Sequence, residues 1–191
     1  MRLAILGGSF DPPHVGHLLA AYDACAQLRL DKLIFVPTGV QPLKPDAVGA
    51  SGTQRLAMVR AMVAAVPAFE VSSLEVDRPG LSFTVDTVRH FAIQHPAAER
   101  YLLLGADVLS TFAQWRDPAE IVRLAQPVVL LRGTEERVPA ELAGAPLTRI
   151  PTRRFDVSST EIRERVRQGK PLRGFVTDGV AELIARERLY C

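Results

Sequence analysis

Cysteine is scarce in this sequence, which has only Cys25 and Cys191 among its 191 residues. Two isolated thiols make neither a disulfide framework nor the ligand spacing of a metal site, so they favour a reducing compartment. Long apolar runs are also lacking: none approaches the roughly twenty residues that a membrane-spanning helix needs. The apolar start, 1–6, is too short for a secretory signal. We therefore expect a soluble, cytoplasmic protein with no membrane partner.

The chain also lacks a strong excess of either charge. It has 23 Lys and Arg against 21 Asp and Glu, a formal net charge of +2. Proteins that bind nucleic acid usually carry a dense basic stripe, so we expect no nucleic-acid partner. The small positive excess suits a small anionic ligand if the basic side chains converge on one pocket.

Short apolar runs alternate along the sequence with amphipathic helical patterns. The runs typical of buried strands are 2–6, 32–36, 101–104 and 127–131, with 69–76 as a half-exposed candidate and 147–150 as a weaker one. The helical patterns cover 15–25, 53–65, 85–92, 161–168 and 180–188. Two long irregular stretches remain, 38–52 and 133–146.

This alternation is typical of βαβ units. It predicts an α/β fold with a doubly wound, Rossmann-like parallel sheet covered by helices on both faces. The chain has no internal repeat and no linker rich in Gly or Ser. We therefore predict a single domain, 1–191, with a small helical part at its C-terminal end.

The strongest motif, 7–17, joins the first strand to the first helix. Gly7 and Gly8 allow a ligand to approach the main chain, and the helix start offers unpaired N–H groups to a phosphate. His14 and His17 are three residues apart, so both imidazoles can lie on one side of the first turn and donate to phosphoryl oxygens. Gly16 between them leaves room for a bulky anion.

This motif matches neither the dinucleotide fingerprint G-x-G-x-x-G nor the P-loop, which disfavours a dehydrogenase or a P-loop NTPase. A helical zinc pair would have i, i+4 spacing and a nearby acid, and both are absent. The plainer alternative is that the two histidines only cap the helix or fill a crevice.

A second motif opens a helix near the C-terminal end. Ser158, Ser159 and Thr160 offer hydroxyls and N–H groups, and Arg163 offers a bidentate fork one turn later, a set that suits the terminal phosphates of ATP. A simple capping box, with Ser158 at the N-cap and Glu161 three residues on, explains part of the same pattern.

Two further segments attract attention. Asp107 follows Gly105 at the end of a predicted strand, where its carboxylate can bind a ribose, and Trp115 lies eight residues further on. The segment 82–87 begins a helix, whose N–H groups can receive a carboxylate or an amide. Taken alone, Trp115 is a core residue and the hydroxyls of Ser82 or Thr84 are caps.

With these motifs the chain resembles the HxGH nucleotidyltransferases, and within them the bacterial nicotinate mononucleotide adenylyltransferases. The resemblance extends over 3–190 and implies transfer of AMP from ATP to nicotinate mononucleotide, without a covalent intermediate. The acceptor phosphate is already an anion, so no general base is needed, and catalysis rests on alignment and charge neutralisation. Mg²⁺ would be held mainly through the ATP phosphates and not by a protein metal site.

The resemblance also assigns roles to particular residues. It implies that the catalytic residues are His14, His17, Lys44 and Arg163. It implies that ATP is bound by Gly7, Gly8, Ser9, Phe10, His17, Gly105, Asp107, Ser158, Ser159, Thr160 and Arg163. It implies that the acceptor is bound by Ser9, Lys44, Thr84, Val85, Trp115 and Arg132, with Trp115 stacked on the pyridine ring. Leu43 departs from the family pattern, which commonly has a histidine before the lysine.

Several alternatives stay open at this point. Another HxGH enzyme would use nicotinamide mononucleotide or phosphopantetheine as acceptor, or would be a cytidylyltransferase. The combination of 82–87 with Gly105, Asp107 and Trp115 favours the pyridine nucleotide. A non-catalytic nucleotide sensor on the same scaffold is the rival of a different class, although a pure binder has no need of both imidazoles. The sequence does not indicate an oligomeric state.

Overall fold

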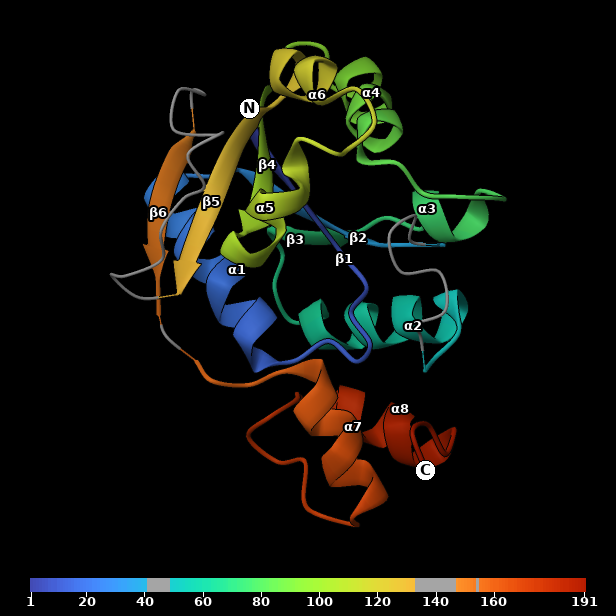
Figure 1. Cartoon of the computed structure of the whole chain (residues 1–191). Coiled ribbons are helices and arrows are strands. Elements are labelled where there is room, and N and C mark those ends of the chain that lie inside the picture. Colours follow the sequence, from blue (N-terminus) through green and yellow to red (C-terminus); the bar gives the residue numbers. More distant parts are fainter. Residues whose placement is uncertain (41–48, 133–146, 154) are drawn as a thin grey trace.

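The computed structural model describes residues 1–40, 49–132, 147–153 and 155–191, apart from the side chains of Asp107, Ser110 and Arg132. Within these residues, six parallel strands form one sheet in the order β3-β2-β1-β4-β5-β6 (Figure 1). The strands are β1 (Arg2–Gly8), β2 (Lys32–Pro37), β3 (Phe69–Val71), β4 (Glu99–Gly105), β5 (Gln126–Arg132) and β6 (Thr148–Thr152). This is the doubly wound order, in which the direction of strand succession reverses between β1 and β4.

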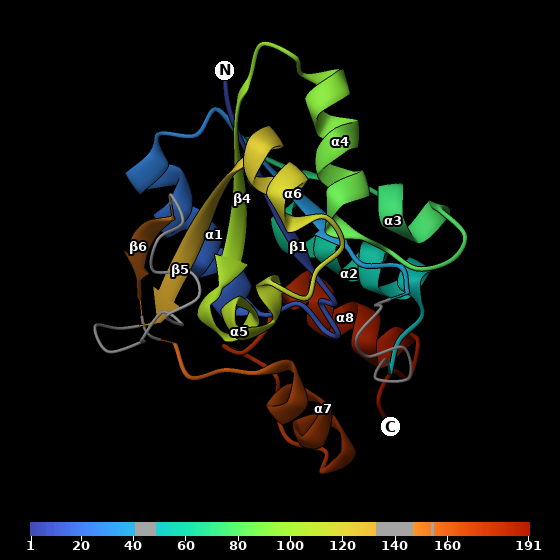
Figure 2. The ribbon, with the colours of Figure 1, turned by 45° about the horizontal axis from the view of Figure 1, so that its top comes forward.

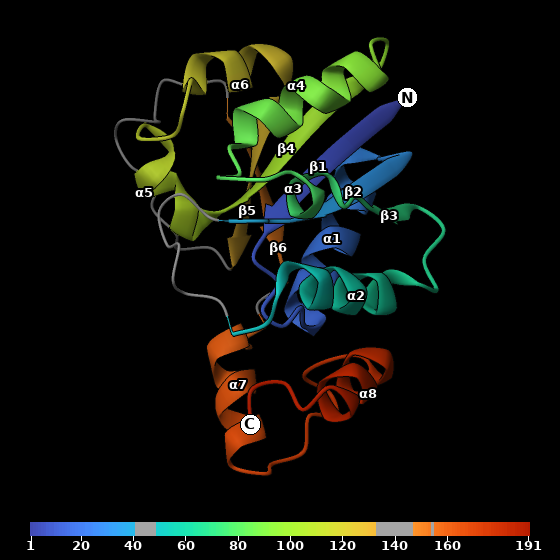
Figure 3. The same ribbon diagram turned by 90° about the vertical axis from the view of Figure 1, so that its right-hand side faces the viewer.

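Helices lie in each connection from β1 to β5, and two more follow β6. They are α1 (Val15–Leu28), α2 (Gly52–Val63), α3 (Leu74–Asp77), α4 (Thr84–Gln94), the 3₁₀ turn η1 (Ala106–Val108), α5 (Leu109–Phe112), α6 (Pro118–Leu124), α7 (Ser159–Arg167) and α8 (Asp178–Arg186). The side view shows α1, α2, α7 and α8 on one side of the sheet and α4 and α6 on the other (Figure 3). The predicted α/β class with helices on both faces is therefore confirmed.

The strand β1 shows why this sheet needs two layers of helices. Its side chains alternate between the two faces: Leu3 and Ile5 pack in the core with α4, α5 and α6, whereas Ala4 and Leu6 pack in the core with α1, α2 and α8. All four are buried. A strand buried on both faces has to be apolar throughout, which is why these strands appear in the sequence as short continuous apolar runs.

The region after β2 departs from the prediction. The run 69–76 was expected to form one half-exposed strand, but β3 ends at Val71 and a short helix, α3, begins at Leu74. The hydroxyl of Ser72 accepts a hydrogen bond from the N–H of Leu74 at 3.2 Å and starts the turn. Serine side chains compete in this way with the ladder of a sheet. The helices α5 and α6 were not predicted at all.

The last two helices close the structure beneath the sheet. Figure 2 shows α7 beyond the end of the sheet toward which the arrow of β5 points, and α8 beside α2. The helix α8 packs against α2 through Val180 and Ile184, both almost fully buried. In the part of the chain that the structure describes, no helix is long and apolar enough to cross a membrane. The prediction of a single domain stays a prediction.

Candidate active site

The candidate site lies where the strand order reverses, at the carboxyl ends of β1 and β4. These ends are held side by side by parallel pairing that runs as far as Leu6 and Leu103. Two pockets open there and share the main chain of Gly7, Gly8 and Gly105. A Cβ placed on Gly7 would meet no atom within 4 Å, so its hydrogen faces open space and a ligand can approach the main chain closely.

The first pocket, which we call the histidine pocket, contains most of the predicted phosphate-binding groups. It is lined by Gly7, Gly8, Ser9, Phe10, His14, His17, Gly105, Ser159, Thr160 and Arg163, among others. The second, the tryptophan pocket, is lined by residues that include Thr38, Glu75, Ser82, Phe83, Thr84, Thr87, Gln114, Trp115 and Arg116. Together the two pockets form one continuous crevice across β1 and β4.

The two imidazoles of the first motif lie together, as the i, i+3 spacing predicted. Their ring centroids are 3.7 Å apart with an angle of 31° between the ring planes. His14 is buried and stands at the N-cap of α1, and the edge of Phe10 supports His17 at a centroid distance of 5.0 Å. A Cβ on Gly16 would lie 3.0 Å from the His14 ring, so glycine is what allows that ring to fold over the helix start.

The hydrogen bonding of His17 fixes its tautomer. Its Nδ1 atom accepts a hydrogen bond from the main-chain N–H of His14 at 3.2 Å. In the neutral ring Nδ1 is then the acceptor and the proton resides on Nε2. His17 therefore presents an N–H donor from the far side of the ring, the group that a phosphoryl oxygen requires.

The start of α7 faces the same pocket from a distant part of the chain. Arg163 donates from Nη1 to the main-chain oxygen of Asp11 at 2.7 Å and from Nη2 to Thr160 Oγ1 at 3.2 Å. The hydroxyl of Ser159 donates to the main-chain oxygen of Pro12 at 2.8 Å. Two segments separated by about 150 residues in the sequence thus form one corner of the pocket, where the partial positive charge of the helix N-terminus suits an anion.

Ser158 has a different position from its neighbours. It is the N-cap of α7, and its Oγ accepts from the N–H of Glu161 at 3.1 Å. It is not among the residues that line the histidine pocket, so the capping interpretation describes its side chain. Arg153 has an exposed side chain that lines this pocket at its rim and pairs with Asp23.

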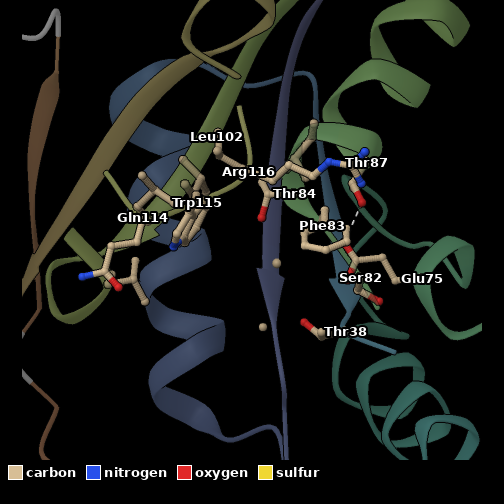
Figure 4. Close-up of a pocket in the computed structure, with 17 residues that line it drawn as sticks. Thr38, Glu75, Ser82, Phe83, Thr84, Thr87, Leu102, Gln114, Trp115 and Arg116 are labelled. Atoms are coloured by element: carbon tan, nitrogen blue, oxygen red, sulfur yellow. Dashed lines mark hydrogen bonds between the residues drawn. The ribbon is translucent and has the colours of Figure 1, made fainter. Parts of the chain in front are cut away.

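The tryptophan pocket spans the end of β1. In Figure 4, Trp115 and Gln114 stand on one side of that strand, and Phe83 and Ser82 stand on the other. The indole of Trp115 lies beside the ring of Phe112 at a centroid distance of 5.2 Å, so it packs against the core and also forms part of the pocket wall. An aromatic ring held in this way suits stacking against a flat ligand.

The start of α4 forms the facing wall. Its N-cap is Phe83 and no side chain of the described residues caps the helix, so the alternative of simple capping by Ser82 or Thr84 is wrong. The first N–H groups of a helix have no partner within it, and Thr84 presents this end to the pocket. Val85, expected at the acceptor, is fully buried and is not among the residues that line this pocket.

Arg116, a residue to which sequence reasoning assigned no role, places a positive charge at the tryptophan pocket. The guanidinium of Arg116 stacks over the Phe83 ring, 4.8 Å from its centroid, and lies 3.8 Å from a carboxylate oxygen of Asp86. Arg116 and the start of α4 together make this wall attractive to an anionic group.

The floor of the tryptophan pocket holds a buried carboxylate, Glu75, with 6% of its surface exposed. Thr87 donates its hydroxyl to Glu75 Oε1 at 2.6 Å (Figure 4). Burial raises the pKa of Glu75 above its ordinary value, whereas the hydrogen bond from Thr87, the charge of Arg78 and the hydrogen bond from Ser82 act in the opposite direction. Nothing in the local sequence pattern identified this residue.

Other predicted residues lie outside what the structure describes. They are Lys44 with its neighbour Leu43, and the side chains of Asp107 and Arg132. The main chain places Asp107 in η1 directly after β4, and Arg132 at the end of β5. Ser9, expected at both substrates, lines the histidine pocket only.

Sequence reasoning also missed two buried charged residues that support the site. Asp11 is 3% exposed and Arg55 is 2% exposed. Asp11 lies within the first motif, between the two glycines and His14, and sequence reasoning assigned it no role. Arg55 lies within a helix whose apolar pattern gave no reason to expect a guanidinium inside. Among the described residues, no group of three or more His, Cys, Asp and Glu side chains is placed to hold a metal ion.

Comparison with known proteins places this crevice in context. Residues 5–165 match the model of a family described as cytidylyltransferase-like. A probable nicotinate-nucleotide adenylyltransferase from Gemmatimonas aurantiaca is 47% identical, over 100% of this chain and 92% of its own length. A protein of the same description from Herpetosiphon aurantiacus is 42% identical, over 99% of this chain and 98% of its own length.

A solved structure has the same fold at much lower identity. The nicotinic acid mononucleotide adenylyltransferase of Plasmodium falciparum, complexed with NaAD, superposes with a TM-score of 0.79 and 16% sequence identity. The match covers 99% of this chain and 97% of the other. At this identity the likeness concerns the fold.

Proposed function

Because the chain belongs to the nicotinate-nucleotide adenylyltransferases, within the cytidylyltransferase-like family, we propose that it joins AMP from ATP to nicotinate mononucleotide. The products are nicotinate adenine dinucleotide and pyrophosphate, a step of NAD biosynthesis. The observation that carries the assignment is the pair of pockets that meet at Gly7, Gly8 and Gly105. A dinucleotide has two nucleotide halves joined through phosphates, and this crevice has two chambers joined over bare main chain.

The histidine pocket suits ATP. His17 offers its Nε2 proton to an oxygen of the α-phosphate, and His14 packs against it and positions the triphosphate. Thr160 and Arg163, with the start of α7, hold the β- and γ-phosphates. All of these groups donate hydrogen bonds, as charged phosphoryl oxygens require.

The tryptophan pocket suits nicotinate mononucleotide. The indole of Trp115 stacks on the pyridine ring, and the start of α4 at Thr84 receives the carboxylate of the base. Arg116 adds a positive charge at the same wall. An anionic carboxylate gains more from this wall than a neutral amide does, which favours nicotinate over nicotinamide.

The chemistry is an in-line displacement at the α-phosphorus. A phosphate oxygen of the acceptor forms the new bond to phosphorus, and the bond from that phosphorus to the bridging oxygen of pyrophosphate breaks. The electron pair leaves with pyrophosphate, and no proton has to be removed from the anionic nucleophile. The protein therefore acts by alignment and by donating to the oxygens on which charge accumulates, with His17 nearest the reacting phosphorus.

Mg²⁺ enters this scheme with ATP, as part of the substrate. Among the described residues that line the pockets, the two carboxylates are already engaged: Asp11 accepts bonds from Gly49, Ala50 and Tyr190, and Glu75 accepts one from Thr87. This arrangement suits an ion that is held mainly by phosphate oxygens and water, as Mg²⁺ commonly is.

The test is pyrophosphate release with Mg-ATP and one of three acceptors in parallel: nicotinate mononucleotide, nicotinamide mononucleotide and phosphopantetheine. We expect rapid release with the nicotinate form and much slower release with the amide. Release with phosphopantetheine instead would overturn the acceptor. Binding of ATP without release in any mixture would indicate a nucleotide sensor.

A further inference from the structure

Arg55 of α2 is almost completely buried, although it lines neither pocket. Its guanidinium donates to three main-chain oxygens that come from different parts of the chain. Nη1 donates to Ser9 at 2.7 Å, Nη2 to Gly39 at 3.2 Å and Nε to Ala50 at 3.2 Å. One rigid planar group thus joins the loop after β1, the loop after β2 and the segment just before the N-cap of α2.

Two of these oxygens belong to segments that form the two pockets. Ser9 lines the histidine pocket. Gly39 donates its own N–H to Ser82 Oγ at 3.2 Å, and Ser82 lines the tryptophan pocket ahead of α4. Gly39 also fits tightly, because a Cβ there would lie 2.2 Å from the main-chain oxygen of Glu75. Arg55 therefore connects the main chain beneath one pocket to the main chain beneath the other.

Ala50, the residue that provides the third oxygen, is also held through its N–H by Asp11. The carboxylate of Asp11 accepts from the N–H of Ala50 at 3.1 Å, while Arg55 donates to the carbonyl of that same residue. The hydroxyl of Tyr190 donates to Asp11 Oδ1 at 2.7 Å. Burial lowers the pKa of Arg55, and the nearby charge of Asp11 acts in the opposite direction.

Burying a guanidinium is costly, and an apolar side chain is often an equally stable replacement. An apolar side chain, however, does not hold three main-chain segments at fixed distances from one another. A planar fork does so, since its donors have a set geometry. The arrangement is therefore better suited to holding a spacing than to adding stability.

We propose that Arg55 is a positioning residue that fixes the spacing between the two pockets, so that the acceptor phosphate lies within reach of the α-phosphorus. This inference rests on the proposed function, in which each pocket holds one substrate. Reacting atoms must lie roughly 3–3.5 Å apart and in line, and a displacement of about 1 Å can cost about 100-fold in rate. Each pocket keeps its own lining when Arg55 changes, so binding of the single substrates should be preserved.

The first test is Arg55→Lys, which keeps the charge but replaces the fork by a single ammonium that is unable to reach three oxygens in the same geometry. We expect kcat to fall about 10- to 100-fold, with the KM of each substrate changed by no more than about threefold. The matched control is Arg60→Lys on the same helix, where the arginine is exposed. The control should have the activity of the unchanged protein.

The second test uses the dinucleotide product, which must occupy both pockets at once. Calorimetry gives its Kd, and the Kd of AMP and of nicotinate mononucleotide, for each protein. Arg55→Lys should weaken dinucleotide binding by a larger factor than the product of the factors for the two halves, because only the dinucleotide senses the spacing. An effect confined to stability would lower Tm, and the factor for the dinucleotide would not exceed the product of the factors for its two halves.

Tyr190→Phe keeps the test decisive if Arg55→Lys does not fold. It removes the hydroxyl that donates to Asp11, and Tyr190 itself lines neither pocket. The variant should show the same losses of kcat and of dinucleotide affinity as Arg55→Lys, but smaller ones. Unchanged kcat and unchanged dinucleotide affinity in the folded variants would overturn the proposal. Absence of turnover in the unchanged protein with nicotinate mononucleotide would instead overturn the proposed function.

Discussion

Arg163 and Asp11 are 152 residues apart in the sequence, yet Nη1 of the arginine donates to the main-chain oxygen of the aspartate at 2.7 Å. The same guanidinium donates to Thr160 Oγ1, so it spans the loop after β1 and the first turns of α7. Both segments line the histidine pocket. The residue that is proposed to bind the leaving pyrophosphate therefore also holds the histidine motif against α7.

Arg163→Lys tests whether the planar hydrogen-bonding geometry of the arginine is needed, or only its positive charge. Lysine keeps the positive charge but is unable to donate to Asp11, Thr160 and a phosphate with one planar fork. We expect the KM for ATP to rise about tenfold and kcat to fall, since a charge-assisted hydrogen bond contributes about 1.5–3 kcal/mol. Arg167→Lys on the same helix, where Arg167 forms an exposed pair with Glu164, is the control. An equal effect of both variants in steady-state assays would contradict the role.

His17→Ala should remove most of the turnover and leave the fold intact. Its Nε2 proton is the donor proposed for the α-phosphate, and loss of one such preorganised donor typically costs about 100- to 1,000-fold in kcat. Because the ring is partly exposed and α1 keeps its other contacts, Tm should change little. Steady-state kinetics and thermal unfolding provide the two measurements.

His90→Ala is the matched control for that variant. His90 lies on α4 and lines neither pocket, so its loss should leave kcat unchanged. A His17→Ala protein with nearly normal turnover would remove His17 from the mechanism, and attention would pass to His14.

The sequence predicted the sheet and pointed to both segments that are proposed to bind phosphate, because their signals are local. A strand covered on both faces has to be apolar, so β1, β2, β4 and β5 appear as short apolar runs. The i, i+3 spacing of His14 and His17 alone predicts that their rings lie together, and the structure confirms the contact.

The buried charged residues escaped prediction because their partners are distant in the sequence. Arg55 binds main-chain oxygens of Ser9 and Gly39, and Asp11 binds the hydroxyl of Tyr190, 179 residues away. Main-chain oxygens carry no sequence information, so nothing near Arg55 identifies them. The helix α6 was missed for a different reason. Asp117 at its N-cap, followed by proline, is a helix-start signal, but a helix of seven residues is too short to show a clear apolar periodicity.

Glu75→Gln should change how stability depends on pH. Burial raises the pKa of Glu75 in the folded protein above its ordinary value of 4.5, so the folded state binds this proton more tightly than the unfolded state does. The stabilisation that results is present below pH 4.5 and is lost as pH rises toward the folded pKa. Glutamine does not titrate, so the free energy of unfolding of the variant should rise relative to that of the unchanged protein across this window.

Urea unfolding of both proteins at several pH values from 4.5 upward measures the difference. A difference that is constant with pH would show that Glu75 has the same proton affinity in the folded and unfolded states. Kinetics on the same variant should show a higher KM for nicotinate mononucleotide and an unchanged KM for ATP, because Thr87 and Ser82 lose a carboxylate partner only in the tryptophan pocket.

Trp115 is the only tryptophan in the chain, so its fluorescence reports on the tryptophan pocket alone. If the indole stacks on the pyridine ring, nicotinate mononucleotide should quench this emission in a saturable manner, and AMP should not. Trp115→Ala should raise the KM for the acceptor about 5- to 150-fold, since stacking of a base on an aromatic side chain contributes about 1–3 kcal/mol. Trp115→Phe, which keeps a ring beside Phe112, should recover part of that loss, while the KM for ATP stays unchanged in both variants. Emission that does not respond to nicotinate mononucleotide would place the pyridine ring elsewhere, and the start of α4 would then have to bind another part of the acceptor.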